Sequence, residues 1–60
     1  MNISSRIAYE AQVRYGADEP WLVVGVRFDP LVTAGIAYSY RESDPLGRVP
    51  VHWRVMPRPR

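Results

Sequence analysis

A chain of 60 residues with eight basic and six acidic side chains has a net charge of only +2, which does not by itself require an anionic partner. The absence of cysteine excludes disulfides and cysteine-based zinc sites, so oligomerisation or docking on a partner is the remaining way to reinforce so small a core. The hydrophobic share of 47% is typical of a globular domain and not of a disordered chain.

The first expected element is a strand over residues 6–15, which have the two-residue period of a half-buried strand. The apolar positions of this period are Ile7, Tyr9, Ala11, Val13 and Tyr15. A helix is the alternative, because Ile7, Ala11 and Tyr15 also lie four residues apart. We favour the strand, since Tyr9 and Val13 would lie off a helical stripe.

The second expected strand follows a turn over residues 16–20 and contains the longest apolar run of the chain. Alternation places Leu22, Val24, Val26 and Phe28 on one face and Trp21, Val23, Gly25 and Arg27 on the other. Because both faces are largely apolar, we expect this strand to be central or covered on both sides. Asp29-Pro30 ends it, since the residue before proline avoids helical geometry and proline interrupts strand pairing.

Two further strands are expected in the second half of the chain. In residues 35–41, Ile36, Tyr38 and Tyr40 alternate with Ala37, Ser39 and Arg41. In residues 49–56, Val49, Val51, Trp53 and Val55 alternate with Pro50, His52, Arg54 and Met56, and the proline indicates an edge strand. Proline and glycine in residues 42–47 predict the reversing turn between the two strands.

These elements predict an all-β fold, a single antiparallel sheet of about four strands in a meander without a helix. We expect one small β domain over residues 1–56 and an extended basic tail over residues 57–60. The apolar face of such a sheet needs a second layer, because burial of each apolar side chain stabilises a fold by about 1.5 to 3 kcal/mol. We therefore expect a homo-oligomer or a subunit bound to another protein, with a tightly curled barrel as the alternative. The expected interface residues are Trp21, Val23, Phe28, Tyr38, Tyr40 and Trp53.

The arginines predict a second kind of surface. If the strands keep register, Arg14, Arg27, Arg41 and Arg54 share the face opposite the apolar one, and Arg58 and Arg60 follow in the tail. These six arginines are the candidate anion-binding residues. A basic sheet face can follow single-stranded nucleic acid, but such surfaces add aromatic platforms for base stacking, and only Trp21 falls on that face here. Nucleic acid is therefore kept as an alternative to a solvated face or a protein-binding face.

No set of residues in the chain predicts a reaction. The formal candidates for a catalytic relay are His52, Ser39, Ser43, Asp29 and Asp44, but nothing in the sequence orders them into one. Most acidic residues fall in expected turns, where solvation by water explains them, and the four glycines lack the spacing of a phosphate-binding loop. We expect a protein that is not an enzyme and uses no cofactor, metal or small-molecule substrate.

Three short segments carry a resemblance to a known family. Residues 26–30 read Val-Arg-Phe-Asp-Pro, Ile36 and Tyr40 keep the spacing of a strand that closes on an aromatic residue, and residues 51–55 read Val-His-Trp-Arg-Val. In this order the segments resemble SsgA-like proteins, the sporulation and cell-division regulators of filamentous spore-forming bacteria. Those proteins are longer, so the resemblance covers the N-terminal half of their fold. Their second Asp-Pro-Tyr is replaced here by Val32-Thr33-Ala34.

The resemblance implies a sheet similar to the whirly type, which assembles into trimers, and a non-catalytic adaptor in cell division or sporulation. The alternatives are a small virion or phage-encoded protein that binds a host protein, and a nucleic-acid-binding regulator that uses the arginines. The N-terminus lacks the features of a signal peptide, and no stretch approaches the roughly 20 apolar residues of a membrane span. The expected location is the cytoplasm, or the virion for a phage protein, without membrane insertion.

Overall fold

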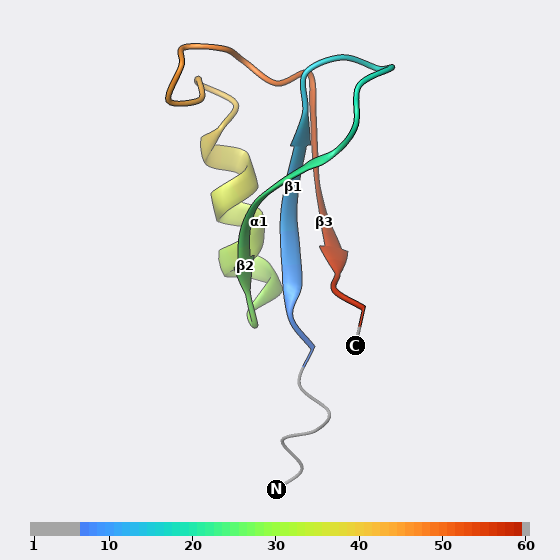
Figure 1. The fold of residues 1–60 in the computed structure, drawn as a ribbon. Coiled ribbons are helices and arrows are strands. Elements are labelled where there is room, and N and C mark those ends of the chain that lie inside the picture. Colours follow the sequence, from blue (N-terminus) through green and yellow to red (C-terminus); the bar gives the residue numbers. More distant parts are fainter. Residues whose placement is uncertain (1–6, 60) are drawn as a thin grey trace, which may run out of the picture.

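The computed structural model describes residues 7–59, which fold into a three-stranded antiparallel sheet with one helix against it (Figure 1). The elements in chain order are β1 (Tyr9–Arg14), β2 (Leu22–Arg27), α1 (Pro30–Ser39) and β3 (His52–Pro57). The strand order is β2-β1-β3, so the first strand is the central one. The expected all-β meander of four strands is therefore wrong, and the fold class is α+β.

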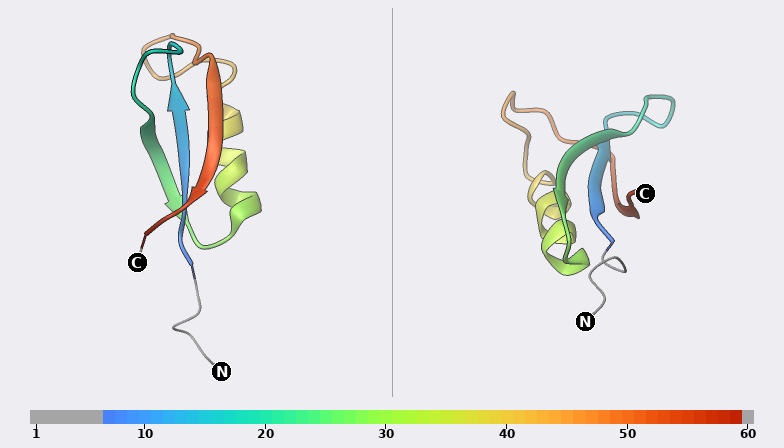
Figure 2. Two further views of the ribbon diagram at one scale, coloured as in Figure 1. Left: turned by 90° about the vertical axis from the view of Figure 1, so that its right-hand side faces the viewer. Right: turned by 60° about the horizontal axis from the view of Figure 1, so that its bottom comes forward.

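Helix α1 carries the chain from one edge of the sheet to the other. Both β2 and β3 run antiparallel to β1, so they are parallel to each other and need a crossover connection. The helix makes this crossover on one face of the sheet, and no helix or strand of residues 7–59 covers the opposite face (Figure 2, left). The layer that was expected from a partner is therefore supplied, on one side, by the chain itself.

The helix begins at Asp29-Pro30, the same dipeptide that ends the preceding strand. The Asp29 side chain accepts a hydrogen bond from the Leu31 amide at 2.8 Å, and its carbonyl accepts one from the Thr33 amide at 2.9 Å. Aspartate is a favoured N-cap, and proline suits the first helical turn because its φ is already helical and its missing N–H would have no partner there. One dipeptide thus stops β2 and starts α1.

The third expected strand does not form, because most of its residues belong to α1. Ile36, Tyr38 and Tyr40 alternate as the residues of a strand would. Thr33 and Ala37, however, lie four residues apart, and they are the side chains that the helix buries. The sequence contains both periods, and the capping dipeptide together with the need for a layer over the sheet decides in favour of the helix.

The strands at the two ends of the chain agree with their expected positions. β1 lies within residues 6–15 and buries two members of its apolar period, and β3 is an edge strand, as the proline just before it indicates. Both expected turns are closed by backbone hydrogen bonds, from Glu19 to Gly16 at 3.0 Å and from Gly47 to Asp44 at 2.9 Å, although the second turn follows a helix and not the strand that was expected. These local predictions are confirmed.

An irregularity in the pairing of β1 with β2 changes which side chains face the helix. Ala11 pairs with Gly25, and the next pair joins Gln12 to Val23, which leaves Val24 as the additional residue of a β-bulge. The residues of β2 before and after the bulge therefore alternate in opposite phase. The expected set of alternating residues on one face of this strand is wrong, because its members divide between two faces.

The core between helix and sheet is small and depends on small side chains. Ala11 and Val13 of β1 and Ala37 of α1 are fully buried. A Cβ atom on Gly25 would lie 2.9 Å from Cγ2 of Ile36, so this helical side chain rests directly on the backbone of β2. The helix approaches the sheet this closely because no side chain projects from the strand at that position.

We expect Gly25→Ala to lower the free energy of unfolding by about 1 to 3 kcal/mol, the usual cost of overpacking a core. The added methyl group would meet Cγ2 of Ile36 at 2.9 Å and Cδ1 at 3.0 Å. Ile36→Ala removes both atoms, so the glycine substitution should be far less costly in that background. Urea unfolding of the four proteins in this double-mutant cycle measures the coupling.

Gly35→Ala is the matched control for this cycle. Gly35 lies in α1, and apart from its chain neighbours and its own helical backbone no described atom lies within 4 Å of its would-be Cβ. Alanine should therefore raise the unfolding free energy in dilute solution by up to about 1 kcal/mol. If both glycine substitutions changed stability equally, the close contact at β2 would not be what limits the position of the helix.

Candidate functional site

The side of the sheet away from α1 is the candidate site, and we name it the open face. Strand pairing places nine residues on it: Trp21, Val23 and Val26 along the β2 edge, Glu10, Gln12 and Arg14 along β1, and His52, Arg54 and Met56 along β3. In the left-hand view of Figure 2 the helix of the described residues lies behind this face. The β2 column is apolar, the central column is polar, and β3 adds basic residues beside a methionine.

Two guanidinium groups lie over one indole ring on the open face. Cζ of Arg54 is 4.0 Å from the centroid of the Trp21 ring, and Cζ of Arg14 is 4.6 Å from it. The His52 ring is tilted against the same indole at a centroid distance of 6.4 Å. Each such contact between a cation and an aromatic face contributes about 0.5 to 1 kcal/mol at an exposed site. The arrangement concentrates positive charge around a single aromatic residue.

Hydrogen bonds hold these two arginines in place. Nε of Arg14 donates to Nδ1 of His52 at 3.0 Å, which requires a neutral imidazole. Nε of Arg54 donates to Oε1 of Gln12 at 2.7 Å. Both bonds join β1 to β3 across the open face, so the guanidinium groups are fixed by the strand pairing and not only by their own flexible stems.

The other end of the open face is acidic but neutralised. The Gln12 amide donates to Oε1 of Glu10 at 2.7 Å, and Nε of Arg58 lies 3.5 Å from Oε2 of the same carboxylate. Glu10 therefore balances Arg58, and among residues 7–59 the positive charge on the open face that has no acidic partner belongs to Arg14 and Arg54.

The structure divides the six candidate anion-binding arginines. Arg14 and Arg54 lie together on the open face. Arg27 pairs with Tyr9 on the helix side and donates to a neighbouring backbone carbonyl at 2.7 Å, and Arg41 follows α1. The expectation that four arginines share one face is wrong, because the bulge reverses β2 and the third expected strand is a helix. Arg60 lies outside the described residues.

The six expected interface residues are divided as well. Trp21 and Val23 belong to the open face. Tyr38 and Trp53 lie on the helix side, where their rings meet edge to face at a centroid distance of 6.0 Å and an angle of 85°. Tyr40 is the C-cap of α1, and Phe28 is exposed beyond the end of β2. These residues do not form one surface.

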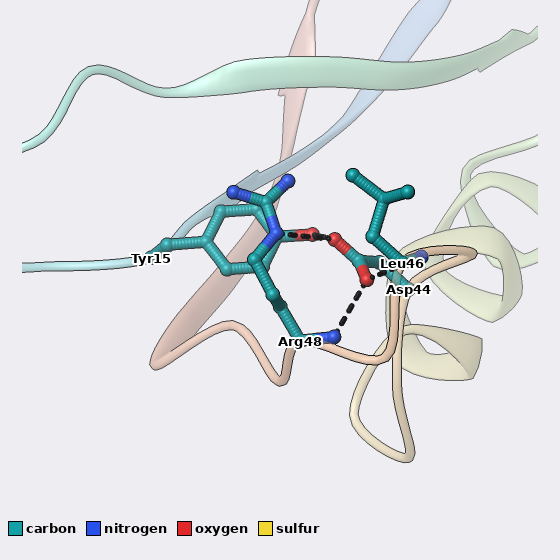
Figure 3. Close-up of polar contacts among 4 residues, drawn as sticks. All are labelled: Tyr15, Asp44, Leu46 and Arg48. Carbon is teal, nitrogen blue, oxygen red and sulfur yellow. Dashed lines mark hydrogen bonds and ion pairs between the residues drawn. The ribbon is translucent and has the colours of Figure 1, made fainter.

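A buried carboxylate organises the loop between α1 and β3 (Figure 3). Oδ1 of Asp44 accepts hydrogen bonds from the Leu46 amide at 2.9 Å and the Arg48 amide at 2.7 Å. Oδ2 accepts from the Tyr15 hydroxyl at 2.8 Å and from Nε of Arg48 at 3.0 Å. The Asp44 side chain is only 4% exposed, so the expectation that it is a solvated turn residue is wrong. Its partners reveal a structural role, because one carboxylate ties the loop to the end of β1.

The pKa values of the two acids in this cluster move in opposite directions. Burial alone would raise the pKa of Asp44, but the hydrogen bonds from Arg48, Tyr15 and Leu46 to its carboxylate outweigh burial and lower the pKa. Burial and the hydrogen bond to Asp44 raise the pKa of the Tyr15 hydroxyl. The cluster is therefore most stable with an ionised Asp44 and a neutral Tyr15.

The sequence signal for this loop is Asp-Pro-x-Gly. It is typical of an aspartate whose side chain accepts a hydrogen bond from the backbone amide two residues later.

The described residues 7–59 contain neither an enclosed pocket nor three metal-ligating side chains close enough together to hold an ion. No helix in this range has the length and apolar character needed to cross a membrane. Comparisons with protein-family models, curated proteins and solved structures find no match. The resemblance to SsgA-like proteins stays a prediction, and one of its elements, the strand that contains Ile36, is helical here.

We expect Asp44→Asn to lower the urea midpoint of unfolding at pH 7, because the amide cannot accept the same charge-assisted hydrogen bonds. The folded pKa of Asp44 is lowered, so its stabilisation is present above the unfolded value near 4 and is lost as the pH falls through the lower folded value. As the pH falls below about 4, the wild type should therefore lose stability more steeply than the variant.

Asp18→Asn is the control for this series, because it removes the same charge from an exposed residue in the turn after β1. It should leave both the midpoint and the acid slope close to those of the wild type. Equal acid slopes for the wild type and the Asp44 variant would contradict the role of the buried carboxylate.

At the alkaline end, the Tyr15 hydroxyl should also affect stability. Its pKa is raised in the folded protein, so the free energy of unfolding should fall as the pH rises above about 10, the value in the unfolded chain.

Proposed function

We propose that this chain is a non-enzymatic protein-binding module that holds an acidic segment of its partner on the open face. The observation that carries the proposal is the pair of guanidinium groups held 4.0 and 4.6 Å from the Trp21 ring. Tryptophan and arginine are the residues in which binding energy concentrates at protein interfaces. A guanidinium also presents its donors in a fork that matches a carboxylate.

The order of these arginines supports the proposal. Arg14 and Arg54 are each bonded through Nε to a residue on the neighbouring strand, so their terminal nitrogen atoms are already directed before a ligand arrives. Ordering a long side chain during binding costs about 0.5 to 1.5 kcal/mol, and part of that cost is already met during folding. The proposal assigns the terminal nitrogen atoms to carboxylates of the partner.

The apolar residues beside the arginines favour a protein over a nucleic acid. Val23 is 51% exposed and Met56 is 39% exposed, and both lie on the open face. Surfaces that track single-stranded nucleic acid offer several aromatic platforms, whereas this face has Trp21 alone, with guanidinium groups already over its ring. A partner strand that alternates acidic and apolar residues would offer carboxylates to Arg14 and Arg54 and apolar side chains to Val23 and Met56.

The wider biological role rests on other grounds. The adaptor role in cell division or sporulation comes from the resemblance to SsgA-like proteins, and the virion or phage role is its alternative. Both stay predictions, and the open face gives no reason to prefer one of them.

We expect a fluorescein-labelled peptide of alternating glutamate and leucine to bind the protein, with glutamine in place of glutamate as the neutral control peptide. Arg14→Ala and Arg54→Ala should each weaken the binding by at least about fivefold, which is the loss of a significant interface residue. Fluorescence anisotropy measures the affinity. In a Trp53→Phe background, Trp21 is the remaining tryptophan, so a change in its emission reports contact at the open face.

Arg27→Ala is the matched control variant, because Arg27 is an exposed strand arginine on the helix side. It should keep the wild-type affinity. Equal loss from all three arginine substitutions would indicate attraction to net charge and would contradict a site on the open face. Binding of labelled oligodeoxythymidine in place of the peptide, with a steep loss on addition of salt, would replace this function with nucleic-acid binding.

A further inference from the structure

Helix α1 has an uncharged side that faces solvent. No residue from Pro30 to Tyr40 is charged, and the exposed residues after Pro30 form a line that we name the outer stripe: Leu31, Val32, Gly35, Tyr38 and Ser39. Leu31 is 82% exposed, and Val32 and Tyr38 are each 50% exposed. A helix that is apolar on all sides is normally buried on all sides, and its contiguous exposed residues mark an interaction surface.

Gly35 lies in the middle of the outer stripe. At 3.6 residues per turn, positions three and four residues away on either side project to the same side of the helix as the glycine. Apart from its chain neighbours and the backbone of its own helix, no atom of the described residues lies within 4 Å of the place where its Cβ would be, and Gly35 is exposed. A second helix could therefore approach closely at this point, at the short end of the usual 8 to 10 Å between packed axes.

The stripe is complementary to itself when two copies run in opposite directions. With a two-fold axis at Gly35, each residue meets the one at the same distance on the other side of the glycine. Val32 then faces Tyr38 of the second copy, and Leu31 faces Ser39. The larger aliphatic residues at one end thus meet the smaller or flatter residues at the other end, without a charge in the contact.

The charges at the two ends of the helix select this direction. Asp29 and Arg41, the charged residues that flank the uncharged helix, are each six residues from Gly35, so an antiparallel pair places opposite charges at the same level at both of its ends. Both are exposed; Asp29 caps the helix, and the Arg41 guanidinium lies 4.7 Å from the Tyr38 ring. A parallel pair would instead place like charges beside each other. The helix dipoles also favour the antiparallel arrangement.

We infer that α1 is the interface of a symmetric homodimer, in which two copies pack antiparallel through the outer stripe with Gly35 at the two-fold axis. The occupant of this surface is a second copy, because the residues of the stripe pair with one another and the two charges that flank the helix, Asp29 and Arg41, have opposite sign. The interface lies on the helix side of the molecule and does not depend on the function proposed for the open face.

The chain has no cysteine, so single cysteine variants can test the geometry directly. Under mild oxidation, Gly35→Cys should form a disulfide-linked dimer at least ten times faster than Ala17→Cys, a variant in the exposed turn before β2. A mixture of Val32→Cys and Tyr38→Cys should form the mixed dimer faster than either variant links to itself. Faster self-linking of each would indicate a parallel pair, and equal rates for positions 35 and 17 would overturn the interface.

The mass in solution gives an independent test. Analytical ultracentrifugation of the wild type should show a dimer that dissociates on dilution, and Val32→Glu should be a folded monomer at the same concentrations. Val23→Glu is the matched control, because Val23 is 51% exposed but lies on the open face, and it should stay dimeric. Arg41→Glu should weaken the dimer at least tenfold, and Arg41→Lys should weaken it less. A wild type that stays monomeric at all concentrations, or a dimer lost equally in both glutamate variants, would overturn the inference.

Discussion

The fold depends on how closely helix α1 can approach the sheet. That distance is set where the Ile36 side chain rests on the bare backbone of Gly25, next to Ala11 on the central strand. With small residues on both layers, a helix of ten residues can cover three strands, but the space between them holds few large side chains. Much of the apolar surface therefore stays outside this small core, and that surface is where binding is expected.

Planar arginines replace much of the packing that a larger protein would obtain from its core. Arg14 and Arg54 lie over Trp21, Arg48 lies 4.4 Å from the Tyr15 ring, and Arg41 lies over Tyr38. A guanidinium is weakly hydrated and stacks on aromatic rings, so it covers apolar surface while its edge still donates hydrogen bonds. Among the described residues no buried side-chain nitrogen or oxygen lacks a partner, so the side-chain polar groups taken from water are compensated.

The two surfaces singled out here lie on opposite sides of the molecule. The open face combines fixed arginines with apolar neighbours, whereas the outer stripe of α1 is uncharged. A dimer formed through the stripe would leave the open face of each copy directed outward. A partner with more than one acidic segment could then bind both open faces of a dimer. The second binding event would be intramolecular, and the resulting gain in affinity would compensate for the small area of a single three-stranded face.

The sequence by itself determined the elements whose signals are local. Alternation located β1, β2 and β3 to within a few residues, and turn residues such as Asp44 and Gly47 located the reversals, because the period of a strand and the chemistry of a turn act within four to six residues. The candidate site was found in part, since Arg14, Arg54 and Trp21 were all named, but their companions Gln12 and His52 were not given a binding role.

Only the tertiary structure decided the remaining features. The segment around Ile36 alternates as a strand would, while Thr33 and Ala37 have the spacing of a helix. It became a helix because the sheet needed a layer and Asp29 could cap it. The bulge at Val24 reversed the faces of β2, and Asp44 was buried by partners from distant parts of the chain. Each outcome depends on contacts between residues far apart in sequence, which no local pattern records.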